Sequence, residues 1–381
     1  MRTIKFYTVG CKVNQYETQL MREHFLNAGF EEIDNLKPAD LYLINTCTVT
    51  HKADADSLSF IRRAKRENPS AKFIVTGCLV ELDEDKIIPL DKNILIVKNE
   101  KKNRILELID SGVDISVEHQ AGITGFYNHC RAFLKVQDGC NNFCSYCKVP
   151  LVRGRSRSKK PEDVISEIKT LIKNGYREIV LCGICLGSYG KDLLPRTELI
   201  DLLKMLDTLE GDFRIRLSSI EAWDITENFI RDIDKLKKFC PHLHIPIQSG
   251  DERILSLMNR PITARGYLEK IEALKRKIPF LVITTDVLVG FPSEKDNNFL
   301  NTLSLVEKIQ PLKVHIFSYS PRPYTRAFLF KEKISSWEIK KRVIFLKRFT
   351  EELSHRLKND FLGRCMRVLF ESSFKEENKT F

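Results

Sequence analysis

The sequence predicts an α/β protein with two regions of largely parallel sheet. Patterns typical of strands and of helices alternate along almost the whole chain, which is the arrangement of parallel sheets covered by helices. The chain has 381 residues, more than one ordinary hydrophobic core accommodates, so two or three domains are expected. Its 43% hydrophobic and 30% charged residues are ordinary for a globular protein.

The first region, residues 1–125, is expected to be an open αβ domain with a parallel sheet. Helical stretches such as NQYETQLMREHFLNAG separate the apolar runs. The strand candidates are IKFYTVG, LYLINT, KFIVTG and the shorter ILIV at 94–97.

The second region, residues 126–330, reads as six strand–helix units, which predicts a partial (β/α)6 barrel. Chemistry in such barrels takes place at the mouth formed by the carboxyl ends of the strands. The strand candidates are AFLKVQ, REIVLCG, RIRLSS, HLHIPI, FLVITTDVLVG and KVHIFSYS; the helical segments include PEDVISEIKTLIKNG, ELIDLLKMLDTL and NNFLNTLSLVEKI.

The last region, residues 331–381, begins with a basic helical stretch, WEIKKRVIFLKRFTEELSHRLKNDF. The segment GRCMRVLFESSF that follows is expected to be the first strand of a small, truncated β domain. Too few residues remain after it to bury a core of their own.

The chain lacks an apolar run of about 18 residues, so no membrane span is expected. Its first residues, MRTIKFYTVG, do not have the pattern of a signal peptide, and a cytoplasmic location is expected. In that reducing compartment eleven cysteines favour metal or redox chemistry over disulfides. We expect Cys240 and Cys365 to be small buried hydrophobes instead.

The formal net charge of +11 favours a polyanionic partner, with nucleic acid ahead of a membrane surface. Two segments are especially basic. Residues 151–160 carry five basic residues and no acidic one, and residues 331–381 carry 13 Lys/Arg against 8 Asp/Glu. Because the first of these follows a cysteine-rich loop directly, it is a candidate for substrate binding.

Three cysteines follow the three strongest apolar runs of the first region. These runs end as TVGCK, INTCT and VTGCL, which places Cys11, Cys47 and Cys78 each just past a strand. Ligands of open parallel sheets bind at the carboxyl ends of the strands, and three loops leaving one edge can bring distant cysteines together. The alternative is three unrelated buried cysteines.

A second set lies in the loop after the first barrel strand, where GCNNFCSYC places Cys140, Cys144 and Cys147 within eight residues. Three thiolates can hold three corners of a [4Fe–4S] cluster and leave the fourth iron open to a small molecule with an amine and a carboxylate. A structural zinc site would need His129 or Cys130 as its fourth ligand and lacks the usual paired spacing. An electron-carrying ferredoxin loop would need a fourth cysteine.

These features resemble a known family. The cysteine triplet, with Tyr146 before its last member, resembles the signature of radical S-adenosylmethionine (SAM) enzymes, which use a partial barrel. With the preceding αβ domain and its trio, the chain is similar to methylthiotransferases, closest to the branch acting on N6-threonylcarbamoyladenosine in tRNA. The stretches that carry the resemblance are TVGCKVNQYET, NTCTVTHKAD, RAFLKVQDGCNNFCSYC, RGRSRS, HIPIQSG, LMNRP, TTDVLVGFPSE and YSPRPYTRA.

The resemblance implies tRNA modification, the methylthiolation of carbon 2 of the modified adenosine at position 37, next to the anticodon. It implies two [4Fe–4S] clusters, one on each cysteine set, with SAM bound at the cluster of the triplet. The hard chemistry then belongs to the cofactors, and the protein supplies placement. It also implies tRNA and an electron donor such as flavodoxin or ferredoxin as partners, and we expect a monomer.

Other candidate residues follow the barrel strands or the first cysteine. The SAM-binding candidates are Tyr146, Gly183, Ser218, Ser219, Gln248 and Ser249, and for all but Tyr146 ordinary loop or capping chemistry is the alternative. Asn14 and Glu17, one turn apart after Cys11, are interpreted first as helix-start residues.

Two departures from the family pattern concern Cys182 with Cys185 and the short C-terminus. The family commonly has a histidine at the second cysteine position. We expect the two thiols to pack in the interior, with a redox pair or an additional metal site as the alternatives. The family also ends in a complete RNA-binding β-barrel.

The alternative functions are a methylthiotransferase acting on isopentenyladenosine in tRNA or on a ribosomal-protein aspartate, or a non-catalytic iron–sulfur or zinc protein that binds RNA.

Overall fold

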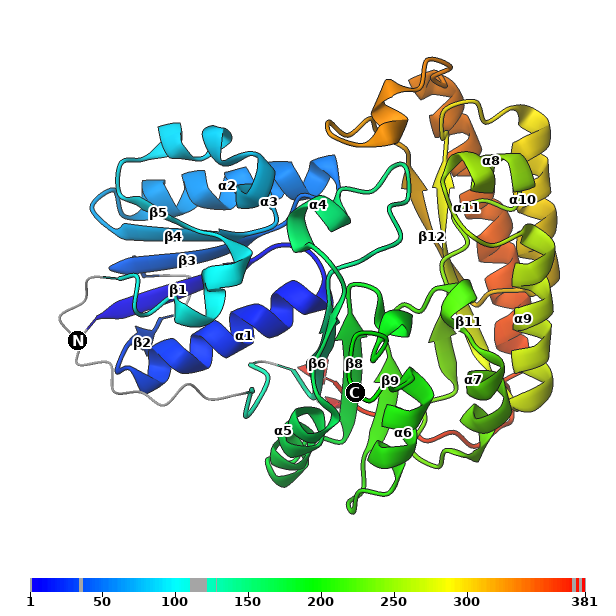
Figure 1. Ribbon diagram of the computed structural model, residues 1–381, viewed down its shortest axis with the longest axis horizontal. Helices are drawn as coiled ribbons and strands as arrows, with labels where there is room; N and C mark the ends of the chain where they lie inside the picture. Colours follow the sequence, from blue (N-terminus) through cyan, green and yellow to red (C-terminus); the bar gives the residue numbers. More distant parts are fainter. Residues whose placement is uncertain are drawn as a thin grey trace.

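The computed structural model describes residues 2–33, 37–109, 122–127 and 129–371, with the backbone of 375–376 and 379–380. Two sheet-containing regions lie side by side, the N-terminal one in blue and cyan and the second in green to orange (Figure 1). Among the described residues no helix has both the length and the apolar character needed to cross a bilayer.

The N-terminal region is a five-stranded, fully parallel sheet with the order β2-β1-β3-β4-β5. The four strands expected from the sequence form, and the two-residue β2 is added at the edge. The strands are β1 Thr3–Thr8, β2 Glu31–Glu32, β3 Leu41–Thr46, β4 Lys72–Gly77 and β5 Ile94–Val97.

Helices cover both faces of this sheet, and every residue of the central strand β3 is buried. One face packs Tyr42, Ile44 and Phe73 against the long helix α2. The other face packs Leu43 and Ile74 against α1. The helices are α1 Lys12–Asn27, α2 His51–Glu67 and α3 Leu79–Leu82, with the 3-10 helices η1 Glu84–Lys86, η2 Ile88–Leu90 and η3 Asn99–Arg104.

The second region contains six parallel strands that follow one another in chain order. β6, β8 and β9 form one sheet, with the short antiparallel β7 at its edge, and β10, β11 and β12 form another. A parallel bridge between Ser219 and His244 connects the two sheets. The strands are β6 Arg131–Asp138, β7 Arg157–Ser158, β8 Glu178–Gly183, β9 Arg214–Leu217, β10 His242–His244, β11 Val282–Val289 and β12 Lys313–Ser318. The partial (β/α)6 barrel is confirmed.

Helices pack on the outside of the barrel, where they bury alternate strand residues in a large apolar core. The short α4 lies in the loop after β6, close to the N-terminal region. The helices are α4 Val149–Arg153, α5 Pro161–Lys173, α6 Leu199–Asp207, α7 Glu227–Asp232, α8 Glu252–Leu257, α9 Ala264–Lys277 and α10 Asp296–Ile309, with η4 Leu186–Ser188, η5 Ala222–Asp224, η6 Ile233–Lys235 and η7 Arg326–Leu329.

The basic stretch forms a long helix, α11 Ser336–Asn359, as expected. The strand expected after it is wrong for its described part, because residues 364–371 form no strand pairing. This segment instead crosses the barrel end at which strands begin: Arg364 stacks 4.0 Å from the ring of Phe280, and Glu371 pairs with Arg131 at 2.9 Å. The short strands β13 Lys375–Glu376 and β14 Lys379–Thr380 pair antiparallel.

The two cysteines expected to be small buried hydrophobes differ in their exposure to solvent. Cys240 is buried next to β10, as expected. Cys365 is exposed, so that expectation is wrong. The extended segment that carries Cys365 lies on the surface and has no apolar core into which a thiol could pack.

Candidate metal centres

The three N-terminal cysteines lie at one edge of the first sheet. Cys11 precedes the first residue of α1, Cys47 directly follows β3, and Cys78 directly follows β4. Since β1, β3 and β4 are adjacent and parallel, their carboxyl ends present the three thiols together. The thiolate charges of Cys11 and Cys78 both act on the pKa of Cys47, so the three thiols lie near one another, and their role as ligands of one cluster stays a prediction.

Two glycines make this approach of the loops possible. Gly10 has a φ of +106°, and a Cβ built on it would lie 2.7 Å from the Cβ and Sγ of Cys47. Gly77 has a φ of +101°, and its Cβ would lie 2.2 Å from the carbonyl oxygen of Thr46. Residues with side chains rarely adopt such angles, and here they would also collide with a neighbouring loop.

The buried members of the trio are weak acids. Burial, followed by the neighbouring Cys78, raises the pKa of Cys47 to about 12. Burial also raises the pKa of Cys78, although Arg153 opposes the shift. Thiolates are the form that binds metals, so metal binding at this site must release protons.

The second trio lies in the loop after β6, at the mouth of the barrel. Burial and the neighbouring Cys144 raise the pKa of Cys147 to about 12. Burial also raises the pKa of Cys144, with Arg260 opposing it. Arg260 is itself fixed by Glu221 at 2.6 Å and by the carbonyl of Pro246 at 2.8 Å, so a positive charge is held beside the loop.

The thiols of each trio are spaced more widely than a single bound ion would require. All six cysteines are described, and in neither trio do the three sulfurs lie within 4.8 Å of one another. A tetrahedral zinc ion with Zn–S bonds near 2.3 Å would need sulfurs about 3.8 Å apart. In this structure neither trio is therefore arranged as a tight single-ion site.

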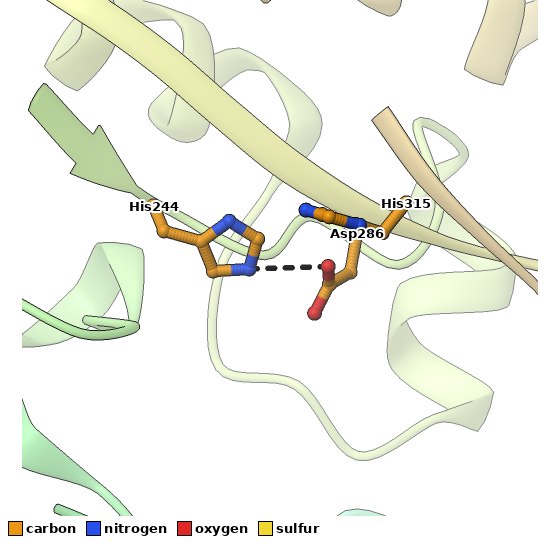
Figure 2. A group of neighbouring side chains, drawn as sticks. All are labelled: His244, Asp286 and His315. Carbon is orange, nitrogen blue, oxygen red and sulfur yellow. Dashed lines mark ion pairs between the residues drawn. The ribbon is translucent and has the colours of Figure 1, made fainter. Parts of the chain in front are cut away.

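A compact group of ligand atoms that the sequence analysis missed lies inside the barrel. His244, Asp286 and His315 project toward one another from β10, β11 and β12 (Figure 2). Nε2 of His244 lies 3.1 Å from Asp286, and its Nδ1 lies 2.8 Å from the hydroxyl of Thr284. Burial lowers the pKa of His315, which favours its neutral form. The sequence signal that could have revealed the group is the alternation in HLH (242–244) and TTD (284–286), which places His244 and Asp286 on the inner face of the barrel.

The SAM-binding candidates lie around the mouth, at or beyond the carboxyl ends of barrel strands. Gly183 ends β8, where a Cβ would lie 2.7 Å from Oε1 of Gln137. Ser219 forms the bridge to His244, and the hydroxyl of Ser218 is buried without a partner among the described residues. Gln248 has a φ of +68° and exchanges backbone hydrogen bonds with β11.

Two other candidates have packing or capping partners. The ring of Tyr146 packs edge-on against Phe291, and its hydroxyl accepts a hydrogen bond from Arg260 at 3.3 Å. Ser249 is buried, and its hydroxyl accepts the backbone N–H of Asp251 just before α8. Tyr146 therefore holds the cysteine loop against the barrel.

The extra cysteine pair occupies two different environments. Cys182 is fully buried in the barrel core, as expected. Cys185 is also buried, but its thiol hydrogen-bonds to Cys140, and this contact lowers the pKa of Cys140. The amide of Asn142 also donates to Cys185, at 3.3 Å. A further thiol therefore lies next to Cys140, the first candidate ligand of the barrel site.

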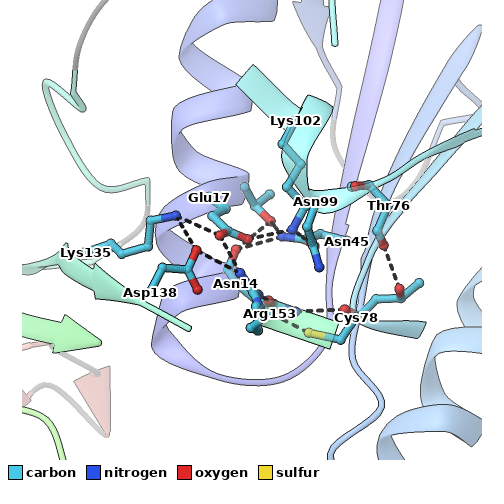
Figure 3. A network of polar contacts seen from close by, with 12 residues as sticks. Asn14, Glu17, Asn45, Thr76, Cys78, Asn99, Lys102, Lys135, Asp138 and Arg153 are labelled. Carbon is cyan, nitrogen blue, oxygen red and sulfur yellow. Dashed lines mark hydrogen bonds and ion pairs between the residues drawn. The ribbon is translucent and has the colours of Figure 1, made fainter. Parts of the chain in front are cut away.

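A buried polar network joins the two regions (Figure 3). Arg153 donates from Nε to Sγ of Cys78 at 3.2 Å and from Nη1 to Glu17 at 2.6 Å. Glu17 also pairs with Lys102 at 2.6 Å and Lys135 at 2.9 Å. Asn14 donates to the carbonyls of Val9 and Thr46 and so connects the loops that carry Cys11 and Cys47.

This network corrects two interpretations made from the sequence. Asn14 and Glu17 are not mainly helix-start residues, since both are buried between the two regions. Of the basic run 151–160, Arg153 is buried in the network and Lys159 pairs with Glu167 at 2.5 Å, whereas Arg155 is exposed. Only part of that run is therefore available to a substrate.

A polar cavity of about 1000 Å³ lies beside the network, between α1, η3 and the β6–β7 edge. Glu17, Lys102, Lys135 and Arg153 are among the residues that line it. None of the six candidate cysteines lines it, and Arg153 separates it from Cys78.

Comparison with known proteins gives matches over both regions. Residues 3–98 match the family described as Uncharacterized protein family UPF0004, and residues 134–306 match the Radical SAM superfamily. The chain is 37% identical over 390 residues to the threonylcarbamoyladenosine tRNA methylthiotransferase MtaB of Bacillus subtilis, covering 99% of this chain and 86% of that protein. It is 33% identical to the tRNA-2-methylthio-N(6)-dimethylallyladenosine synthase of Caldicellulosiruptor saccharolyticus, with 99% and 84% covered.

Among solved structures, the chain resembles the radical S-adenosylmethionine methyltransferase TsrM from Kitasatospora setae. The TM-score is 0.62 at 12% identity, and the match covers 86% of this chain and 77% of that one. At this identity the match shows a shared fold.

Proposed function

Because the chain belongs to the family of threonylcarbamoyladenosine tRNA methylthiotransferases, which are radical SAM enzymes, we propose that it methylthiolates tRNA at carbon 2 of N6-threonylcarbamoyladenosine at position 37. The family match covers nearly the whole chain, and the identity to this branch exceeds that to the dimethylallyladenosine synthase. Methylthiolation of the isopentenyl-type adenosine is the second candidate.

The observation that carries this proposal is the pair of incomplete cysteine trios on two parallel-sheet edges. We assign Cys140, Cys144 and Cys147 to a [4Fe–4S] cluster that binds SAM, and Cys11, Cys47 and Cys78 to a second cluster. Bound there, the cofactors supply a carbon radical and the sulfur to be inserted. Three protein ligands at each site leave one iron of each cluster for SAM or sulfur.

The side chains around the barrel mouth would place SAM and the adenine. Gly183 ends β8 in close contact with the side chain of Gln137, and Ser219 and Gln248 line the neighbouring strand ends. His244, Asp286 and His315 offer a carboxylate and imidazole nitrogens inside the barrel, where they would orient a polar purine. Tyr146 and Arg260 fix the cysteine loop.

The remaining parts of the proposal concern organisation and partners. Residues 1–125 would act as the sulfur-inserting domain, 126–330 as the radical domain and 331–381 as an RNA-contacting segment. We propose a cytoplasmic monomer that takes electrons from a flavodoxin or a ferredoxin. The net charge of +11 supports a tRNA substrate.

The decisive experiment is mass spectrometry of tRNA nucleosides from cells that lack this gene. Complementation with the wild-type chain should restore the 2-methylthio form of threonylcarbamoyladenosine, and the Cys140→Ala/Cys144→Ala/Cys147→Ala variant should not. The Cys240→Ala variant, changed at a buried thiol away from both trios, is the control and should restore it.

Two results would contradict the proposal. If the triple variant restored the 2-methylthio product, the cluster assigned to Cys140, Cys144 and Cys147 would not take part in the reaction. If cells that lack the gene lost the 2-methylthio form of the isopentenyl-type adenosine instead, that adenosine would be the substrate. The reconstituted wild-type protein should also contain about eight irons per chain, four for each trio.

A further inference from the structure

We propose that Arg153 is a positioning residue that couples the two cluster sites and raises the reduction potential of the cluster at Cys11, Cys47 and Cys78. The inference rests on the proposed function in one respect, the assignment of Cys78 as a cluster ligand. It adds a barrel residue to a site whose three thiols all come from the N-terminal region.

Helix α4 joins the two trios directly. The N–H of Val149, its first residue, approaches Sγ of Cys147 at 3.4 Å. The guanidinium of Arg153, its last residue, donates from Nε to Sγ of Cys78 at 3.2 Å (Figure 3). One five-residue helix therefore touches a ligand of the barrel site at one end and a ligand of the N-terminal site at the other.

The contact is held rigidly, since Arg153 is 3% exposed and its remaining nitrogens bond to Glu17 and Asn14. The helix itself is fixed to the N-terminal region at two further points. Asn99 donates to the carbonyl of Val152 at 2.9 Å, and Lys148 pairs with Asp83 at 3.4 Å. Movement of the cysteine loop would therefore move the donor to Cys78.

The electrostatic effect of this donor has a definite sign. In the described part of the chain, Arg153 is the one side chain that donates a hydrogen bond to a sulfur of the N-terminal trio. A cation and a hydrogen bond at a ligand sulfur both stabilise the more reduced, more negative state of a cluster. Burial strengthens the interaction because little water screens it.

The proposed reaction provides a role for a cluster whose reduced state is stabilised. Joining a carbon-2 radical to a methylthiolate forms one C–S bond with two electrons and leaves one electron in excess. That electron needs an acceptor near the sulfur, and the N-terminal site is the nearest candidate. A guanidinium beside Cys78 favours its acceptance there.

The test isolates the N-terminal cluster. In the Cys140→Ala/Cys144→Ala/Cys147→Ala background, the midpoint potential is measured by redox titration monitored by electron paramagnetic resonance. Arg153→Gln should shift it to a more negative value. Arg153→Lys keeps the positive charge but loses the planar guanidinium donor. Its midpoint potential should therefore lie between that of the background protein and that of Arg153→Gln. Arg155→Gln, an exposed arginine two residues on, should leave it unchanged.

An unchanged potential in Arg153→Gln with four irons retained would overturn the inference. Should Arg153→Gln fail to hold a cluster, Arg153→Lys decides, and a wild-type potential in that variant would overturn the inference as well. Failure of the background protein itself to bind a cluster would instead refute the proposed function, so the two failures are distinguishable.

Discussion

Gly10 shows how strongly single residues determine the N-terminal site. Its backbone conformation and its distance from Cys47 both exclude a side chain. We expect Gly10→Ala to displace the loop of Cys11 or that of Cys47 and to remove the iron of this trio. The barrel site should keep its four irons, because its ligands lie in a different loop.

Gly29→Ala is a matched control for this prediction. Gly29 also has a positive φ, +83°, but a Cβ there would meet no atom within 4 Å. The control should lose about 1 kcal/mol of stability from backbone strain and retain all its iron. Iron analysis with Mössbauer spectroscopy compares the two variants, and equal iron content would show that the steric argument is wrong.

Glu17 is the only carboxylate shared by Lys102, Lys135 and Arg153 among the described residues. Glu17→Gln leaves these buried cations short of a counter-ion, and we expect a loss of about 3–5 kcal/mol in the free energy of unfolding at pH 7. Glu351→Gln, at an exposed pair on α11, should cost at most about 1 kcal/mol. Anaerobic urea unfolding measures both values.

The pH dependence of Glu17 has a clear sign. Burial opposes its ionisation, but Lys102, Lys135 and Arg153 outweigh burial and hold its pKa well below the usual range. Its contribution is therefore complete above the unfolded pKa of about 4.3 and is lost as pH falls through the lowered folded pKa. The difference in stability between wild type and Glu17→Gln should be constant from pH 7 to 6 and should narrow in strong acid.

At the residue scale the sequence predicted which cysteines come close together, although not their surroundings, and their role as cluster ligands stays a prediction. Strand-end positions and loop spacing predicted which thiols gather, because they depend on local patterns. The contact of Arg153 with Cys78 joins residues 75 positions apart, across a boundary between two sheets. Its place in a basic run suggested a solvated or substrate-binding side chain, and only the packing of α4 against α3 shows otherwise.

Among the elements, α11 is anchored to the barrel through a buried ion network. Arg342 pairs with Glu294 at 2.9 Å, Asp296 at 2.7 Å and Glu338 at 3.1 Å. Arg342→Ala would leave Glu294 buried without its cation, so we expect a loss of about 3–5 kcal/mol. Hydrogen exchange along α11 should rise and report the loosened helix.

Arg348→Ala on the exposed side of the same helix is the control, and its effect should stay within about 0.5 kcal/mol. If both variants unfolded at the same urea concentration as the wild type, the ion network would not be what holds α11.

The elements that the sequence predicted are those with a strong apolar pattern. All six barrel strands and the long helices formed within a few residues of their expected limits. β2 was missed because it consists of two glutamates and has no apolar signal. The strand expected near residue 365 failed because an apolar run predicts a strand only if a partner strand is available, and here the chain lies against the barrel end instead.

Across the whole molecule, contacts at the barrel mouth also join the two regions. Arg322, in the loop after β12, donates to the carbonyl of Thr48 and pairs with Asp54, both at 2.7 Å. His51 approaches the carbonyl of Pro321 at 3.1 Å. With Arg153, these contacts connect the loops of both cysteine trios, which keeps their relative position fixed.

The charge of the molecule gives a prediction for tRNA binding. Lys340 and Arg348 are exposed on α11. Reversing both to glutamate should weaken tRNA binding and make its salt dependence shallower, by about 0.9 in log–log slope for each phosphate contact removed. Fluorescence anisotropy at several salt concentrations measures this slope.

The control reverses two exposed lysines on α5, Lys169 and Lys173, and so makes the same change in net charge. An equal loss of affinity in the control would mean that overall charge, and not α11, governs binding.

The placement of Arg153 also has a consequence for how the protein matures. The barrel triplet lies within eight residues, but its loop is fixed by residues made later, Arg260 and the carbonyl of Met258. The N-terminal trio spans three strands, and its last contact waits for a residue made after the first barrel strand. The proposed N-terminal site would therefore be completed only after translation has delivered Arg153, and not by the folding of its own region alone.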